Sequence, residues 1–466
     1  MENQIDRDGG RAASGYRYGW YTTAVLMVGY TFSFLDRQIL NLMVGPIKAD
    51  LGISDVQFAI LTGGAFGIFY TIMGLPIGWL ADRYPRKWII SGGIAAWSLM
   101  TAMCGLARTF PQLVLARIGV GVGEATLSPS AHSMLSDLFD KTRLPKAMSL
   151  YTIGIYIGAG IAMIVGGTVV GMIDRTPDVV LPVLGHMRSW HMVFIAVGLP
   201  GLLVALWVAT LREPKRMLRR DETEELTTQG FSLRRIWAFL SDQPLMSVSL
   251  FLGAATFSVL SYTDNWFPEL FIRSWGWGPQ RTGLVIGSVS LIAGPLGMLS
   301  AGWWSSRMIA RGQADGCLRL TAYAAAAIAG PAVLMPLMPN PMLMAILVVP
   351  IKFLGGFTPV LIPAAIQMIA PVELRAQLGA FFMFTVGIVG VSFGPILPAV
   401  LNDYVFHDEM ALHYSLALTA AVVAPLAFVL LSIGMRQYRE RLAVLERSEA
   451  AARKGGPLAI RCLQRR

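Results

Sequence analysis

YTFSFLDRQILN, the stretch at residues 30–41, places Asp36 beside Arg37 inside an otherwise apolar run from about Trp20 to Ile47. A charged side chain in the hydrocarbon of a bilayer costs several kcal/mol, so such residues mark protein interiors or water-filled cavities. The pair therefore predicts a bundle of membrane helices that surrounds a polar cavity.

The composition of the whole chain is that of a membrane protein. Of its 466 residues, 55% are hydrophobic and 14% are charged, whereas an average soluble domain carries about 25% charged residues. Apolar runs of about 20 residues recur along the chain, and each can cross about 30 Å of hydrocarbon. We therefore predict an all-α membrane protein, because a β-barrel would show alternating segments of about ten residues.

Twelve apolar runs are long enough to span a bilayer. They lie at about residues 20–47, 55–80, 87–107, 111–137, 145–172, 190–211, 244–272, 282–305, 317–338, 341–369, 374–401 and 412–435. We expect two six-helix bundles joined by a charged linker. The predicted units are an N-terminal segment at 1–17, a first bundle at 18–211, a linker at 212–243, a second bundle at 244–435 and a basic tail at 436–466.

Lysine and arginine residues are divided unevenly between the two faces. Of the 38, 29 lie on the face of the N-terminus, six lie on the other face, and Arg37, Arg117 and Lys352 lie within spans. Cytoplasmic loops carry the excess of basic residues, so both termini are expected in the cytoplasm of a multi-pass protein of the bacterial inner (cell) membrane. The net charge of +10 follows from this sorting and does not indicate nucleic acid. The tail is expected either to lie on the anionic leaflet or to be solvated.

The two halves of the chain resemble each other. GWLADR at 78–83 ends the second run, and GWWSSR at 302–307 ends the eighth, 224 positions later. Arg117 in the fourth run is matched by Lys352 in the tenth, 235 positions later. These matches predict a parallel six-plus-six repeat, an arrangement found in transporters with a central site.

GWLADRYPRK at 78–87 resembles the signature that the major facilitator superfamily carries between its second and third helices. Pro85 departs from the glycine of the general pattern, although it still makes a tight turn. With the twelve runs, the resemblance covers residues 18–435 and implies the major facilitator fold.

Three further stretches are similar to the spinster-like branch of that superfamily. They are FLDR at 34–37, RIGVGVGEA at 117–125 and SDLF at 136–139. This resemblance implies export of lysolipids or sphingoid phosphates, with proton coupling. The anion:cation symporter branch also has an Asp-Arg pair in helix one and a Gly-Glu element in helix four, so small organic anions such as sugar acids are the alternative substrates.

Residues of the first helix advance by 100° per position. Tyr30, Ser33, Arg37 and Asn41 then form one polar stripe, while Asp36 points about 100° away from Arg37. We expect Arg37 to face the cavity and Asp36 to face a neighbouring helix. Deep charges mark ion or substrate paths, so we favour a transport role over an ion pair that only fixes helix packing.

Arg117 and Glu124 lie two turns apart on one face of the fourth run, about 10 Å apart along its axis. The family resemblance places helices one and four together along the cavity, where Arg117 is expected to reach Asp36 and Glu124 to reach Arg37. An arginine favours the ionised form of a nearby acid, and a dry pocket favours its protonated form. We expect Asp36 and Glu124 to accept protons, and Arg37 and Arg117 to set their affinity and hold an anionic headgroup. Helix packing is the alternative role of Glu124.

Several polar residues outside this cluster have more than one interpretation. Lys352 is expected either to bind the substrate anion or to extend toward water. Asp264 and Glu269 lie near the outer end of the seventh run, where a gate with Tyr262 and simple solvation are the alternatives. His132 is assigned to packing.

A cytoplasmic latch is predicted at the signature stretch. Gly78 allows close helix approach, Asp82 can cap a helix or pair with Arg83 and Arg86, and Asp137 is a candidate partner. Ion pairs that break and re-form bias a two-state equilibrium. The basic residues of this stretch also satisfy topology, and both roles can hold together.

The sequence thus predicts a secondary transporter of an amphipathic or anionic organic solute that works by alternating access and is proton-coupled. The expected partners are the solute, protons and membrane lipids, with the chain acting as a monomer. We expect neither an enzyme nor a cofactor, because nucleophile elbows, phosphate loops and metal-ligand spacings are not evident. A sensor is a further alternative, although the parts outside the membrane are too short for an evident output domain.

Overall fold

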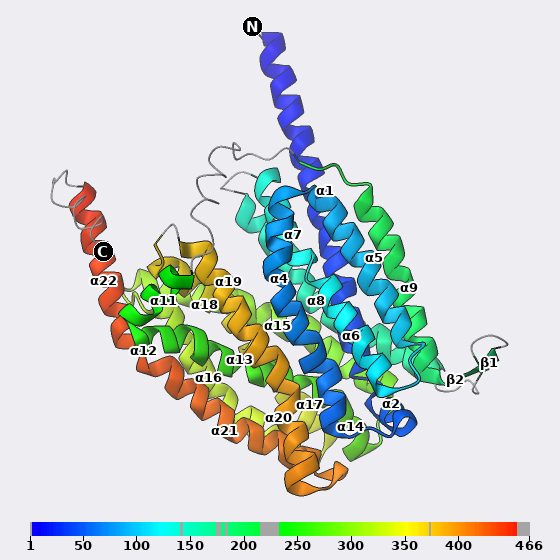
Figure 1. Cartoon of the computed structure of the whole chain (residues 1–466). Coiled ribbons are helices and arrows are strands. Elements are labelled where there is room, and N and C mark those ends of the chain that lie inside the picture. The colour runs from blue at the N-terminus through cyan, green and yellow to red at the C-terminus, as the bar shows by residue number, and fades with distance from the viewer. Residues whose placement is uncertain are drawn as a thin grey trace.

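The computed structural model describes residues 2–139, 143–173, 179–181, 185–214, 233–371 and 374–453. Helices fill almost all of these segments and pack side by side (Figure 1). The predicted linker between residues 215 and 232 and the end of the predicted tail at 454–466 lie outside the described residues.

The first half of the chain is helical apart from one hairpin. Its elements are α1 (Glu2–Leu40), α2 (Val44–Leu51), α3 (Asp55–Ala59), the π-helix η1 (Ile60–Gly64), α4 (Ala65–Arg83), α5 (Arg86–Cys104), α6 (Phe110–Glu124), α7 (Leu127–Leu138), α8 (Leu144–Ile173) and α9 (Ser189–Ala209). α3, η1 and α4 follow one another without a break and form one rod. α1 begins before the first apolar run, and its first turns project from the bundle (Figure 1).

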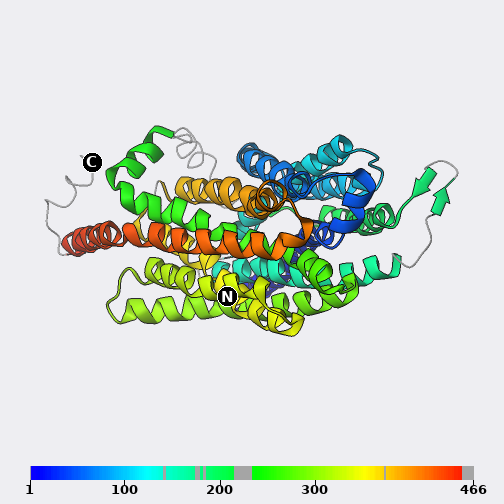
Figure 2. The same ribbon diagram turned by 90° about the horizontal axis from the view of Figure 1, so that it is seen from below.

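A short hairpin is added to the all-α fold that the sequence predicts. β1 (Val179–Leu181) pairs antiparallel with β2 (Gly185–Met187) between α8 and α9, and the pair projects sideways from the bundle (Figures 1 and 2). β1 is built from valine and leucine, and β-branched residues are enriched in strands. The segment is too short to have shown a period in the sequence.

The second half continues with helices broken by short 3₁₀ and π segments. Its first rod comprises α12 (Pro244–Ser247), η2 (Val248–Gly253), α13 (Ala254–Tyr262), η3 (Thr263–Trp266) and α14 (Phe267–Trp275), preceded by α11 (Leu233–Asp242). The others are α15 (Pro279–Ala310), α16 (Gly316–Leu334), η4 (Met335–Leu337), α17 (Pro341–Gly355), α18 (Thr358–Ile369), α19 (Arg375–Thr385), η6 (Val386–Ser392), α20 (Phe393–Val400), η7 (Leu401–Phe406), η8 (Glu409–Ala411), α21 (Leu412–Ile433) and α22 (Met435–Arg453).

Within the described residues, nine helical segments are long and apolar enough to cross a membrane by length and composition. The count of twelve spans stays a prediction. One expected span, at 111–137, is broken into α6 and α7 around Ala125 and Thr126. Pro129 follows within the first turn of α7, and proline lacks the N–H that an unbroken helix would require.

The first expected span, at 20–47, is also broken. α1 ends at Leu40, and α2 starts at Val44. Pro46 accounts for the break, because its ring would clash with the carbonyl of Leu42 in a continuous helix. Asn41 therefore lies in the turn after α1 and not on the helical stripe where the sequence analysis placed it.

Glycine brings α8 and α15 into backbone contact where the two halves meet. A Cβ on Gly167 of α8 would lie 2.4 Å from the carbonyl oxygen of Pro279, and one on Gly283 of α15 would lie 2.1 Å from that of Met163. A Cβ on Gly287 would lie 2.6 Å from the carbonyl oxygen of Gly160. Only glycine permits this approach, so the two helices form a close seam between the halves.

The other seam, between α4 and the rod of α19, η6 and α20, is closed at one end only. A Cβ on Gly67 would lie 2.8 Å from Cγ1 of Val391, and one on Gly63 would lie 2.8 Å from the carbonyl oxygen of Ser392. Gly74 and Gly78 lie on nearly the same face of α4, seven and eleven positions after Gly67. A Cβ there would meet no described atom within 4 Å, so the halves separate toward the end of α4 that lies nearer the termini.

Candidate functional site

Glu124 and Arg37 form the centre of the site. Glu124 ends α6, and its Oε2 accepts hydrogen bonds from Ser33 Oγ at 2.5 Å and Arg37 Nε at 2.6 Å. Arg37 Nη2 lies 2.5 Å from the same oxygen. The side chain of Glu124 is fully buried and that of Arg37 is 16% exposed. The expected contact between Glu124 and Arg37 is therefore confirmed, with Ser33 one turn before Arg37 on α1 as a third member.

Aromatic rings surround the guanidinium of Arg37. Its Cζ lies 4.9 Å from the ring centroid of Phe34, 4.4 Å from that of Phe66 and 4.9 Å from that of Tyr70. Phe34 belongs to α1, and Phe66 and Tyr70 are one turn apart on α4. A cation over aromatic faces is stabilised by the ring quadrupoles, more strongly where water is excluded. The rings hold Arg37 without adding a second anion.

Asp36 points away from Arg37, as expected, and faces α5. Its Oδ2 accepts a hydrogen bond from Thr101 Oγ1 at 3.1 Å. Its Oδ1 is buried and has no hydrogen-bond partner among the described residues. Oε1 of Glu124 is likewise buried and has no hydrogen-bond partner among the described residues. Each of the two acids thus has one bonded oxygen and one buried oxygen at which a proton can sit without breaking a contact of the structure.

Arg117 corrects one expectation of the sequence analysis. It was expected to reach Asp36, but its Nε donates to the backbone carbonyl of Leu61 at 3.3 Å. Its Cζ lies 5.3 Å from the ring centroid of Phe66, and Nη1 has no hydrogen-bond partner in the described part of the chain. Leu61 lies in the π-helix η1, which the sequence did not predict, so the carbonyl that competes with Asp36 could not be foreseen.

In the second half, Lys352 of α17 forms an ion pair with Asp264 of η3. The side chains are 16% and 18% exposed, respectively. Asp264 is therefore not a merely solvated residue, and the ammonium of Lys352 is bound to protein and does not extend into bulk water. Beside Asp264, Asn265 Oδ1 accepts a hydrogen bond from Asn41 Nδ2 at 3.2 Å. This bond joins the second half to the turn that follows α1.

Two tyrosines lie near these ion pairs. Tyr262 of α13 lies within electrostatic range of Arg37, Tyr70 and Asp264, and Tyr156 of α8 lies within range of Asp264 and Tyr262. Arg37 and Glu124 from the first half therefore share a region with Asp264 and Lys352 from the second half. Tyr262 lies in this region, but a gating role for it stays a prediction.

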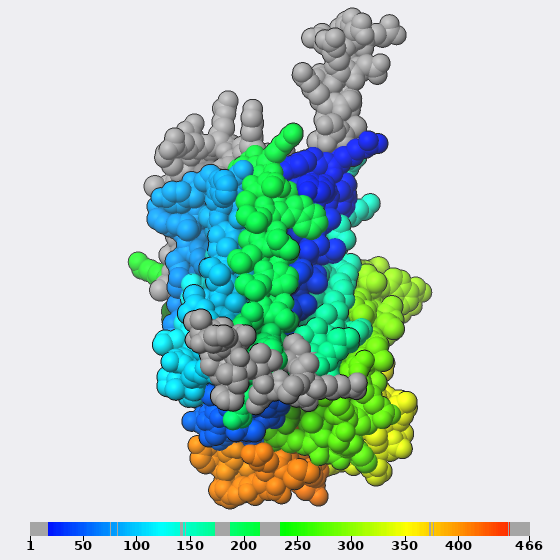
Figure 3. Space-filling view, turned by 90° about the vertical axis from the view of Figure 1, so that its right-hand side faces the viewer, coloured from blue at the N-terminus to red at the C-terminus, as the bar shows by residue number. Residues whose placement is uncertain are grey.

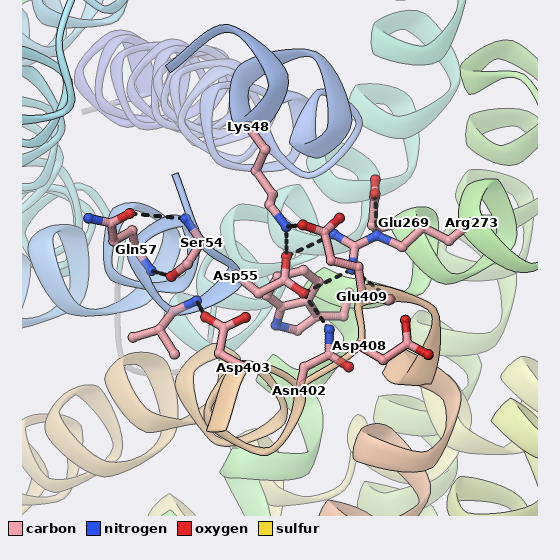
Figure 4. Close-up of polar contacts among 12 residues, drawn as sticks. Lys48, Ser54, Asp55, Gln57, Glu269, Arg273, Asn402, Asp403, Asp408 and Glu409 are labelled. Atoms are coloured by element: carbon pink, nitrogen blue, oxygen red, sulfur yellow. Dashed lines mark hydrogen bonds and ion pairs between the residues drawn. The ribbon is translucent and has the colours of Figure 1, made fainter. Parts of the chain in front are cut away.

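An ion-pair network closes the face away from the termini (Figure 4). Asp55 at the start of α3 is fully buried, and its carboxylate accepts hydrogen bonds from Arg273 Nη1 and Nη2 at 2.9 and 2.8 Å and from Asn402 Nδ2 at 2.6 Å. Lys48 of α2 also pairs with Asp55, and it contacts Glu409 at 2.9 Å. The network connects both halves, since Arg273, Asn402 and Glu409 belong to the second.

We call Lys48, Asp55, Arg273, Asn402 and Glu409 the outer network. Figure 3 shows the orange segment around η7 directly below the blue segment of α2, at the end of the molecule that the network closes. The sequence did not reveal this site, because Lys48 and Arg273 are simply two of the six basic residues on the face opposite the N-terminus. Glu269, considered there as solvated or as part of a gate, is 3% exposed and bonds Arg273 at 2.7 Å, so the solvated alternative is wrong.

The predicted latch is present in part. Arg86 Nη1 contacts Asp137 at 2.5 Å and the Ser133 carbonyl at 2.9 Å, and Arg86 Nε contacts Glu213 at 2.8 Å. None of these partners belongs to the second bundle, so Arg86 fastens α5 to α7 and to the start of the linker after α9. The guanidinium of Arg83 stacks on the ring of Trp79 at 3.8 Å.

Two further predictions concern residues near the latch and the site. The side chain of Asp82 lies outside the described residues, and Gly78 faces the separated part of the seam described above. His132 packs edge-on against Tyr151, with 5.5 Å between ring centroids. This contact is the packing role that the sequence analysis assigned to it.

Comparison with known proteins identifies the family. A family model described as Major Facilitator Superfamily matches residues 26–395. The chain belongs to the major facilitator superfamily. It is a multi-pass membrane transporter and not an enzyme, and its signature stretch at 78–87 lies within the matched range.

The individual relatives reported below are 23–25% identical to this chain. An MFS-type efflux pump of Mycolicibacterium smegmatis is 25% identical over 91% of this chain and 94% of the relative. A D-galactonate transporter of Escherichia coli is 23% identical over 88% and 96%. The crystal structure of a bacterial homologue of the human lysosomal transporter Spinster, inward-facing and unoccupied, matches with a TM-score of 0.71 and 23% identity over 91% of this chain and 97% of that one. This structural match supports the fold.

Proposed function

We propose that the chain is a proton-coupled transporter of an anionic organic solute, and that an amphipathic anion such as a lysolipid or a sphingoid phosphate is its substrate. The observation that carries the proposal is the Arg37–Glu124 ion pair. In this pair the side chain of Glu124 is fully buried and that of Arg37 is partly exposed. A guanidinium at the wall of a cavity is a binding group for carboxylates and phosphates.

Coupling follows from competition for Arg37. While Glu124 is ionised, its Oε2 holds both the Nε and Nη2 of Arg37. A proton on Glu124 removes the negative charge and weakens this hold, so Arg37 becomes available to an anion from the cavity. Release of the anion lets Glu124 ionise again. Asp36 is the second proton site of the proposal, with Oδ1 as the protonated atom and Thr101 as the fixed donor to Oδ2.

The arrangement of the seams supports alternating access. The outer network joins the halves at one face, and the glycines of α4 lose their partners toward the other. This conformation is open toward the face of the termini, which we propose is the cytoplasmic side of a bacterial inner membrane. The chain is proposed to work as a monomer in contact with membrane lipids.

The surroundings of Arg37 favour an amphipathic anion. Phe34 and Tyr70 present partly exposed rings beside the cation, and an acyl or sphingoid chain can be buried against such rings while its headgroup bonds the guanidinium. A compact sugar acid is the second candidate. The amides of Asn41 and Asn265 can bond hydroxyl groups, and one relative is named a D-galactonate transporter.

The test is flux in proteoliposomes with an imposed pH gradient. The purified chain is reconstituted, and uptake of lysophosphatidate and of D-galactonate is measured with and without the gradient. We expect gradient-dependent movement of lysophosphatidate. Movement of D-galactonate alone would replace the amphipathic substrate with the sugar acid. If neither these anions nor related phosphates and sugar acids move, the proposed function is wrong.

A further inference from the structure

The Lys352–Asp264 pair repeats, in the second half, the logic of the pair in the first. Asp264 lies 228 positions after Asp36, and Lys352 lies 235 positions after Arg117. These offsets are close to the 224 positions between the two signature stretches, so Asp264 and Lys352 stand where Asp36 and Arg117 stand in the first half, although Asp36 and Arg117 do not bond each other. In the second half the two side chains are in direct contact.

The pair faces the same region as Arg37. Asn265, next to Asp264, bonds Asn41 from the turn after α1, and Tyr262 is in electrostatic range of both Arg37 and Asp264. Exposed fractions of 16% for Lys352 and 18% for Asp264 show that neither group is fully buried. By contrast, the side chain of Glu124 is fully buried.

Few other charges compete for this pair. In the described part of the chain, the titratable groups shown to face Asp264 are Lys352 from α17, Tyr156 from α8 and Tyr262 from its own rod. The tyrosine hydroxyls are neutral at ordinary pH. Asp264 is therefore the anion that neutralises Lys352, and an anionic solute that binds Lys352 must displace it or meet its negative charge at close range.

We infer that Asp264 is a second proton switch of the transport site: ionised, it occupies Lys352, and protonated, it releases Lys352 to bind the anion. The inference rests on the proposed function and deepens it, because each half then contributes one cation and one acid that guards it. A substrate anion that bridges Arg37 and Lys352 would bind together with a proton on each acid.

Linkage makes the inference measurable. If anion and proton favour each other at one site, anion binding takes up protons, and the coupling is reciprocal. Replacing Asp264 by asparagine removes the competing charge and the proton site together. The Asp264→Asn chain should therefore bind the anion more tightly than the wild type at high pH and take up fewer protons when it does so.

The experiment uses the purified full chain in weakly buffered detergent solution, with lysophosphatidate or D-galactonate as the probe, whichever the wild type transports. Binding affinity and proton uptake are measured together between pH 6 and pH 8. We expect Asp264→Asn to take up about one proton fewer per chain and, at pH 8, to bind about tenfold more tightly, within the usual range of coupling factors. Glu440→Gln, which removes an exposed acid of α22, is the matched control.

Two more variants distinguish the loss of the proton site from a folding defect. Lys352→Gln should weaken anion binding, and Asp264→Asn with Lys352→Gln removes both charges, so no unpaired ammonium is left. Equal proton uptake by the wild type and a folded Asp264→Asn or double variant would overturn the inference, while the proposed function would stand. A wild type that transports neither anion would instead overturn the proposed function.

Discussion

The carboxylates of Asp36 and Glu124 differ in their hydrogen-bond partners. Glu124 meets a guanidinium and a hydroxyl on one oxygen, whereas Asp36 meets only the hydroxyl of Thr101. Arg117 is the base that the sequence analysis expected beside Asp36, but the Leu61 carbonyl binds it instead. Asp36 thus lacks a bonded cation, and its protonation breaks no ion pair among the described residues.

Substitution of Asp36 by asparagine tests its role in coupling. The amide keeps the shape and can still accept from Thr101, but it cannot take up a proton at physiological pH. We expect transport driven by a pH gradient to fall at least about tenfold, while exchange of anion for anion survives. Thr101→Val, which keeps the acid and removes only its hydrogen bond, should retain gradient-driven transport. Unchanged gradient-driven flux in Asp36→Asn would show that the proton site lies elsewhere.

Arg37 is predicted to be a large contributor to stability because its removal strands a buried charge. Breaking a buried ion pair from one side typically costs about 3–5 kcal/mol. We expect Arg37→Met to lower the thermal unfolding temperature in detergent, and Arg37→Met with Glu124→Gln to recover much of the loss. If the double variant is as unstable as the single one, the loss comes from the aromatic packing of Arg37 and not from the stranded carboxylate.

At the scale of elements, the outer network fastens two rods that belong to different halves. Asp55 begins the rod of α3, η1 and α4, and Arg273 lies near the end of the rod that finishes with α14. The bidentate pair between them is buried, whereas Glu409 at the rim is 67% exposed. Exposed pairs contribute about 0–1 kcal/mol, so the strength of the closure comes from Asp55.

Asp55→Asn should therefore open the outer face. Phe58 of α3 packs near Trp266 across the interface, with 6.0 Å between ring centroids, and Phe58→Cys can serve as a reporter there. In a background without the native cysteines, an impermeant maleimide applied from that face should label the reporter about tenfold faster when Asp55→Asn is present. Glu409→Gln is the matched control and should change the rate little. Equal rates for both would mean that the network does not hold the face closed.

The sequence predicted helices well and their interruptions poorly. Long apolar runs identified the helical segments because burial in lipid requires them, and the contact between Glu124 and Arg37 followed from spacing and family resemblance. The breaks after Leu40 and Glu124 lie close to Pro46 and Pro129, which a count of apolar residues does not weigh, and the π-helix η1 depends on hydrogen bonds that periodicity does not show. The Lys352–Asp264 pair joins residues 88 positions apart, and only the packed structure brings them together.

At the scale of the whole molecule, one seam runs closed along α8 and α15 while the seam at α4 is closed at one end. In the proposed alternating-access cycle, this asymmetry makes the glycine face of α4 the place where the two conformations should differ. A Cβ on Gly67 would overlap Val391, whereas a Cβ on Gly74 would meet no described atom within 4 Å. In a conformation open to the other side, we expect the end of α4 near Gly74 to contact the second half and the end near Gly67 to separate from it.

Opposite shifts are expected from bulky residues at these two glycines. Gly67→Val would overlap Val391, and overpacking of this kind costs about 1–3 kcal/mol, so the outer face should open and the reporter at Phe58→Cys should label faster. Gly74→Leu meets open space in the present conformation but would obstruct the opposite closure. It should keep labelling slow and stop net transport while anion binding persists. Shifts in the same direction would contradict this view of the α4 seam.

The unbroken rod of α3, η1 and α4 has a mechanical consequence. Asp55 lies six residues before Leu61, so a displacement that pulls Asp55 from Arg273 is transmitted through one helix to the carbonyl that holds Arg117. An arginine released from that carbonyl has Asp36 as a nearby acid, and its arrival would drive a proton off that acid. In the proposed transport cycle, the rod would therefore link the opening of the outer network to the protonation of Asp36.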